Sequence, residues 1–375
     1  MNRRGLITIY VFFALIFVST FGATLLSRSI HADRVAHISA DWQRALPLAD
    51  AAIETSMWNL HVGDFNDLAA AQMSGGSYWA DLNPTEAPLQ FAVVGHGLFG
   101  TMQRNVEVMA QVTPTSIFQF GLFGSERVEV DGNNRIDSFH SAQGAYDPAA
   151  PGSNGDVGTN ATTYGGMEIS GSIYVNGQVA VGAQVADPQS IVDLSGGSAT
   201  ITGDPPFQSQ QAPLPMLDVV VPPELQPLCT DMVVAGQTTI VLPAGEYCFN
   251  NLVVGGGSTL TADGPVKIYI TNYFHATGNA TVGVMGDPTQ LQMLFMSSSQ
   301  ATIESTMAGT TDFYGGMYGP TARISIGGDA QVYGSVIGRT VELEGTAQIH
   351  YDEALADAPG PIGFYRVRVL TWREL

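Results

Sequence analysis

The chain opens with an uninterrupted apolar run from Leu6 to Leu26 that contains no charged residue. Its length matches the roughly 20 residues that a helix needs to cross the hydrocarbon core of a bilayer. Arg3 and Arg4 stand directly before the run, and positive residues favour the cytoplasmic side of a membrane. The pattern predicts a cytoplasmic leader over residues 1–5, a transmembrane or pilin-core helix over 6–26, and a translocated remainder. Because the run continues into helix-like sequence, its removal as a secretory signal is not expected.

Apolar positions recur with the period of a helix from residue 27 to residue 62. The stripe comprises seven apolar residues and one arginine: Ile30, Arg34, Ile38, Trp42, Leu46, Ile53, Met57 and Leu60. This predicts an extended amphipathic helix over 27–62 that continues the membrane segment and could bend at Pro47. Two alternating stretches, 89–94 and 105–112, resemble strands, so residues 63–120 are expected to be a linker with a small β element.

The remainder of the chain repeats a short pattern. Residues 326–332 read apolar, any, Gly, polar, Ala, Gln, apolar, and the same pattern returns 17 positions later at 343–349. Related units occur at 130–136, 194–201 and 278–282. A period of 17 to 20 residues fits one coil of a parallel β-helix, in which strands stack at about 4.8 Å. The sequence therefore predicts a mainly β fold, with a parallel β-solenoid over 121–355 preceded by the long N-terminal helix.

Some segments should lie outside the regular coils. Two Pro-rich stretches, 204–215 and 221–227, are expected to leave the solenoid, because proline cannot donate to a strand ladder. A stack of coils also exposes unpaired backbone groups at both ends, and these need covers. The strands before Phe120 could cover one end. In the C-terminal segment 356–375, the alternating stretch 364–372 could cover the other end or pair with those strands.

Composition and charge narrow the class of protein. The 43 glycines and 20 prolines fall between short β-branched runs, as in a protein of many short strands and tight turns. The chain has a net charge of −20. Residues 1–44 hold five Arg and two Asp, a net charge of +3, so residues 45–375 carry a net charge of −23. Between Arg135 and Arg323 the only cation is Lys267, which excludes a nucleic-acid partner for the body. The acidity is interpreted as solubility outside the cell, and cation binding along Asp-rich turns stays an alternative.

Two cysteines, Cys229 and Cys248, are separated by 19 positions, close to one period of the repeat. A disulfide between neighbouring coils is therefore expected if the body lies in an oxidising compartment. The alternative is a pair of buried free thiols.

Parallel β-helices include polysaccharide-degrading enzymes, so catalysis has to be weighed. Such lyases need a basic residue beside acidic calcium ligands, and such hydrolases need paired carboxylates across a groove. The central stretch offers Lys267 alone. The cluster His350, Tyr351, Asp352 and Glu353 follows the final repeat and is interpreted as coil termination with surface hydrogen bonds. We expect no enzyme, no catalytic residue, no cofactor and no metal site.

The N-terminal sixty residues resemble PilX-type pilus assembly proteins, through Arg3-Arg4-Gly5, the apolar helix and the stretch 48–54. The body resembles the β-helical domain often attached to such N-termini, at 123–139, 152–160, 242–249 and 347–355. The resemblance implies cleavage by a prepilin peptidase between Gly5 and Leu6, and no enzymatic activity. Most major pilins carry Glu at the fifth mature position, where Tyr10 stands here, which favours a minor subunit.

Together these patterns predict a structural, minor pilin-like subunit or pilus assembly protein. It would be a single-pass protein of the inner membrane with its body in the periplasm or on the cell surface, incorporated in a pilus if it is processed. Its expected partners are other pilin-like subunits through the helix, the inner membrane and prepilin peptidase. The alternatives are an unprocessed signal anchor, an envelope adhesin that binds surface glycans along the solenoid, and a carbohydrate-active enzyme.

Overall fold

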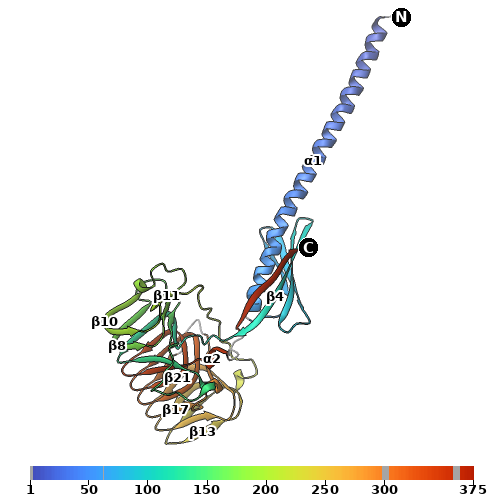
Figure 1. The fold of residues 1–375 in the computed structure, drawn as a ribbon. Helices are drawn as coiled ribbons and strands as arrows, with labels where there is room; N and C mark the ends of the chain where they lie inside the picture. The colour runs from blue at the N-terminus through green and yellow to red at the C-terminus, as the bar shows by residue number, and fades with distance from the viewer. Residues whose placement is uncertain (1–2, 62, 298–303, 358–363) are drawn as a thin grey trace. The chain divides into compact units, whose positions relative to one another are not determined.

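The computed structural model describes residues 3–61, 63–297, 304–357 and 364–375. The chain is mainly β with one long N-terminal helix, as the sequence predicts (Figure 1). It divides into two compact units. Unit 1 comprises Met1–Thr113 and Tyr365–Leu375, and unit 2 comprises Pro114–Phe364.

Helix α1, Arg3–His61, is 59 residues long and joins the two predicted helical segments without a break. Pro47 lies inside the helix, which continues on both sides of it. Among the described residues, α1 is the one helix long and apolar enough to cross a membrane. Its first half exposes large apolar side chains, with Phe17 exposed by 70% and Phe21 by 57%. Its second half is buried through small and aliphatic side chains, among them Ala49 and Ala52.

Unit 1 covers that second half with a five-stranded sheet in the order β1-β2-β3-β4-β23. The strands are β1 (Leu68–Met73), β2 (Gly76–Pro84), β3 (Gln90–Phe99), β4 (Met102–Thr115) and β23 (Phe364–Glu374). The pairs β1–β2, β2–β3 and β3–β4 are antiparallel. On β3, a Cβ at Gly97 would lie 2.1 Å from the carbonyl oxygen of Ala45, so glycine is what allows helix and sheet to approach this closely.

The region predicted as a linker, 63–120, is therefore mostly part of a folded unit with its own apolar core. Of the two alternatives for the C-terminal stretch, the structure has β23 paired with the strands before Phe120. The end of β23 lies beside the start of β4: the Leu375 N–H donates to the Asn105 carbonyl, and Arg104 pairs with Glu374. Both strands thus meet unit 2 from the same end of the sheet.

Unit 2 consists of two runs of parallel strands. The N-terminal run comprises β5 (Leu122–Gly132), β6 (Arg135–Phe139), β7 (Val157–Thr159), β8 (Met167–Val175), β9 (Val179–Val181), β10 (Val192–Ile201) and β11 (Phe207–Ser209). The C-terminal run comprises β12 (Thr230–Val234), β13 (Thr239–Leu242), β14 (Gly245–Val254), β15 (Thr259–Ala262), β16 (Val266–Ala276), β17 (Thr281–Gly283), β18 (Leu291–Phe295), β19 (Glu304–Met307), β20 (Asp312–Ile326), β21 (Gln331–Leu343) and β22 (Gln348–Asp352). Most of these strands pair in parallel with a later strand of the same run, as β14 does with β16. Alternate side chains point inward and form one continuous apolar core.

The order of the coils differs from the order of the sequence. β21 and β22 pair with β5 and β6, which in turn pair with β7 and β8. β5 and β6 therefore lie inside the array of parallel strands, with partners on both sides. The strands before Phe120 build the sheet of unit 1, and the expectation that they cover an end of the solenoid stays a prediction.

The chain returns between the two runs through a strap, residues 210–229. The strap lies over an outward row of apolar side chains contributed by successive strands: Cys248, Tyr269, Leu294, Tyr318, Ile337 and Phe123. The hydroxyl of Tyr318 donates to the Leu217 carbonyl at 2.7 Å, and the Val219 N–H donates to Ser297 Oγ at 2.9 Å. The predicted interruption 204–215 is only partly outside the coils, since β11 still pairs with β9.

Cys229 and Cys248 form a disulfide, with their Cα atoms 4.5 Å apart, that joins the end of the strap to β14. Replacing both cysteines by alanine is expected to lower the free energy of unfolding by about 3 kcal/mol, since the bond closes a short loop in the unfolded chain. The measurement is the urea midpoint of the strand circular dichroism signal. Wild type in excess reductant should show the same loss. A midpoint that responds neither to reductant nor to the substitutions would contradict the prediction.

Candidate functional site

Two rows of outward side chains run across four neighbouring strands of unit 2, β20, β21, β22 and β6. The first row is set by the register of the ladder and consists of Tyr314, Tyr333, His350 and Asp137. The second row lies two positions earlier on each strand and consists of Asp312, Gln331, Gln348 and Arg135. The residues between the rows are core residues, for example Val332 and Ile349, because successive side chains of a strand point to opposite faces.

The first row is a ladder of ring contacts. Tyr314 and Tyr333 stack with their ring centroids 4.6 Å apart, and Tyr333 lies 5.0 Å from the His350 ring. Tyr146, from the loop that follows β6, packs at 3.9 Å from His350, and Phe139 packs edge-on against Tyr146 at 5.7 Å. Burial raises the pKa of the Tyr314 and Tyr333 hydroxyls, so both stay protonated at neutral pH.

Asp137 anchors the ladder. Its fully buried carboxylate lies 2.7 Å from His350 Nδ1, accepts from Arg135 Nε at 2.6 Å, and accepts from the Tyr146 hydroxyl at 2.8 Å. Burial alone would raise the pKa of this carboxyl, but the hydrogen bonds from His350 and Arg135 outweigh it, and the pKa lies below its ordinary value. The interpretation of the 350–353 cluster as surface hydrogen bonding is wrong, because His350 is only 1% exposed and is held by an internal carboxylate.

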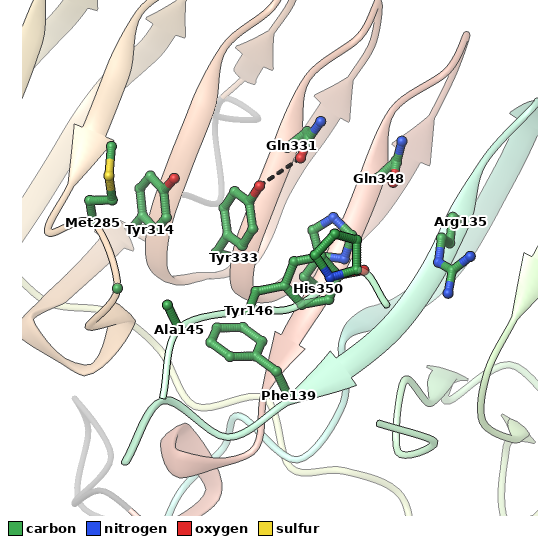
Figure 2. Close-up of a pocket in the computed structure, with 12 residues that line it drawn as sticks. Arg135, Phe139, Ala145, Tyr146, Met285, Tyr314, Gln331, Tyr333, Gln348 and His350 are labelled. Atoms are coloured by element: carbon green, nitrogen blue, oxygen red, sulfur yellow. Dashed lines mark hydrogen bonds between the residues drawn. The ribbon is translucent and has the colours of Figure 1, made fainter. Parts of the chain in front are cut away.

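The two rows and the loop enclose a groove of about 670 Å³. Figure 2 shows Gln331 and Gln348 on one side of Tyr333 and His350, with Phe139 and Ala145 on the other. Met285, which is 72% exposed, and Gly286 line the end beyond Tyr314. The lining is thus aromatic and apolar with a few polar groups on one side, the usual make-up of a small-molecule site.

The site residues that the sequence predicts are not among the lining residues, although His350 of the 350–353 cluster is. Gly5 and Leu6 belong to α1, where the structure describes the backbone alone. Cys229 and Cys248 hold the strap. Asp352 is buried beside the groove and accepts from the Ser141 and Ala354 N–H groups through Oδ1, and burial raises its pKa. Within the described ranges, no three His, Cys, Asp or Glu side chains are placed to hold a metal ion.

Sequence reasoning missed the groove residues, although a signal for them exists. Residues 313–315 read Phe-Tyr-Gly and residues 332–334 read Val-Tyr-Gly, 19 positions apart. Aligning the two coils puts Tyr314 over Tyr333 and Asp312 over Gln331, as the ladder does. Tyr146 carries no such signal, because it reaches the row from a loop.

Comparison with known proteins adds limited information. Residues 231–358, within unit 2, match a family model described as "Domain of unknown function (DUF7305)". No curated protein matches the chain. The DUF3494 domain of a Shewanella frigidimarina ice-binding protein is 12% identical, with a TM-score of 0.38, over 64% of this chain and 99% of that one. The competence-associated pilin ComZ from Thermus thermophilus is 11% identical, with a TM-score of 0.25, over 89% and 97%.

Proposed function

We propose that this chain is a membrane-anchored, pilin-like structural subunit of a bacterial envelope that carries unit 2 outside the cytoplasm. One observation carries the proposal: the two halves of α1 differ in what covers them. The second half is covered by the sheet of unit 1, whereas Leu15, Phe17, Val18 and Phe21 are each more than half exposed. A continuous apolar helix surface of this size is stable only in lipid or against other apolar helices.

Within this proposal, unit 2 is a parallel β-solenoid. The parallel pairing of strands one coil apart and the continuous inward row of aliphatic side chains support that interpretation. Such a stack forms a rigid body that suits a structural or display role. We propose no enzymatic role, since the buried carboxylate of Asp137 behind the groove is held by Arg135, Tyr146 and His350.

The finer proposal is a minor, PilX-type subunit processed between Gly5 and Leu6. Its helix would then pass from the bilayer into a bundle of other pilin-like helices, exchanging one apolar surrounding for another. Fractionation followed by peptide mapping of the mature N-terminus tests both levels. A membrane-bound chain that starts at Leu6 supports the processed subunit, a membrane-bound chain that starts at Met1 supports a fixed anchor, and an intact chain free in the cytosol contradicts both.

A second candidate function is an envelope-anchored adhesin that binds polysaccharide on unit 2. The groove beside the aromatic ladder favours it, because the groove combines aromatic rings with the half-buried amides of Gln331 and Gln348. The two functions are compatible, since an anchored subunit can display a binding surface.

A further inference from the structure

We infer that the groove between the aromatic row and the row containing Gln331 and Gln348 is a binding site for a neutral saccharide. The inference gives the adhesin candidate a specific site and rests on that candidate. It concerns unit 2 alone, so it does not depend on how α1 is anchored or processed.

The apolar part of the groove suits the ring of a sugar. A pyranose presents a face of C–H groups that packs against aromatic rings, while its hydroxyl groups project around the rim. Phe139 and Tyr146 form one wall, and Tyr333 forms the floor between that wall and the amides. These three rings are held by mutual edge contacts at 5.7 to 6.4 Å, so the surface exists before any ligand arrives.

The polar part of the groove suits hydroxyl groups. Gln331 Oε1 accepts from the Tyr333 hydroxyl at 2.7 Å, which fixes the amide orientation and leaves its N–H groups as donors. Gln348, the aligned residue on the next strand, makes no side-chain hydrogen bond to another described residue. A primary amide can both donate and accept, as a sugar hydroxyl can, and two amides one coil apart form a short row of such partners.

The charges of the groove favour a neutral ligand over an acidic one. Its one lining cation, Arg135, already donates to Asp137 and lies 5.2 Å over the ring of Tyr174. Asp137 balances the charge of Arg135, and the lining brings no lysine or second arginine to a carboxylate or sulfate. Residues 45–375 also carry a net charge of −23, which repels polyanions.

The test is calorimetric titration of the full chain, held in a detergent without a sugar headgroup, with cellohexaose, maltohexaose and hexa-N-acetylchitohexaose. At least one of the three should bind saturably. Gln348→Leu and Phe139→Ala should each raise the Kd at least tenfold. Their matched controls are Gln208→Leu on β11 and Tyr273→Ala on β16, both outside the groove lining, and these should leave the Kd unchanged.

Circular dichroism establishes that each variant is folded, and Gln348→Leu decides the question if Phe139→Ala does not fold. Binding that Gln348→Leu weakens and Gln208→Leu does not weaken supports the inference. The absence of binding to all three probes at millimolar concentration overturns it. Binding that survives Gln348→Leu, or binding to polygalacturonate alone, also overturns it. The N-terminal mapping described above is unaffected by any of these results, so failure of the site and failure of the anchor are distinguished.

Discussion

Replacing Asp137 by alanine is expected to lower the free energy of unfolding of unit 2 by about 3 to 5 kcal/mol, as removal of one member of a buried ionic network does. The carboxylate is fully buried and holds Arg135, Tyr146 and His350 together from two strands and a loop. Without it, Arg135 and Tyr146 lose a hydrogen-bond acceptor, and His350, which is only 1% exposed, loses its partner in the interior. The measurement is urea unfolding of the full chain at pH 7, followed by circular dichroism.

The surface variant Asp187→Ala is the matched control, because that exposed aspartate makes no side-chain cap and should change stability by less than about 0.5 kcal/mol.

The pH dependence of the stability difference gives a second check. Since the pKa of Asp137 lies below its ordinary value of 3.8 in the folded chain, its contribution is complete above pH 3.8 and is lost as the pH falls through the lower folded-state value. The gap between wild type and Asp137→Ala should therefore be constant from pH 7 to about pH 5 and close only in stronger acid. A gap that closes near neutral pH would contradict this account.

Replacing Gly171 by alanine is expected to cost about 4 kcal/mol. Gly171 has a φ of +89° and lies in register between Gly132 and Gly197 on neighbouring coils. A Cβ there would lie 2.1 Å from the carbonyl oxygen of Gly132, a backbone atom that cannot move without separating two coils. The cost combines left-handed backbone strain of about 1 kcal/mol with overpacking of a close-packed ladder, at about 3 kcal/mol.

Gly286→Ala separates the two contributions. Gly286 has a similar φ of +83°, but nothing lies within 4 Å of its Cβ position. It should therefore show the backbone term alone, about 1 kcal/mol. Equal losses in the two variants would show that close approach of the coils at Gly171 is not what demands glycine.

The sequence was enough to predict the long N-terminal helix and a mainly β body. It was not enough to predict the order in which the strands of unit 2 lie side by side. The uncharged run from Leu6 and the pattern at 326–332 and 343–349 are local signals, each with one physical explanation. By contrast, every coil of a parallel stack presents the same inward aliphatic row. Any coil could therefore pair with any other by pattern alone, and nothing in 122–130 indicates that it pairs with 336–343. The sheet of unit 1 was underestimated because β4 and β23 are separated by the whole of unit 2.

The groove was beyond prediction for a related reason. Tyr314, Tyr333 and His350 come from consecutive coils and could be aligned by period. Arg135, Asp137 and Tyr146 join them only because the first coil lies against the last. A site assembled across a break in chain order leaves no fixed spacing in the sequence. From the sequence alone, His350 was therefore interpreted as part of a surface cluster that follows the final repeat.

The double connection between the units has a mechanical consequence. Because β4 ends and β23 begins at the same end of the sheet, tension applied there pulls the two strands in the same direction and does not slide one past the other. The load passes instead to the ladder between β3 and β4, whose ten aligned pairs run from Gln90 and Gln111 to Phe99 and Met102. The hydrogen bonds between antiparallel strands are perpendicular to the strands. A force that slides β4 along β3 therefore strains all of these hydrogen bonds at once and not one after another. This ladder therefore bears such tension in shear.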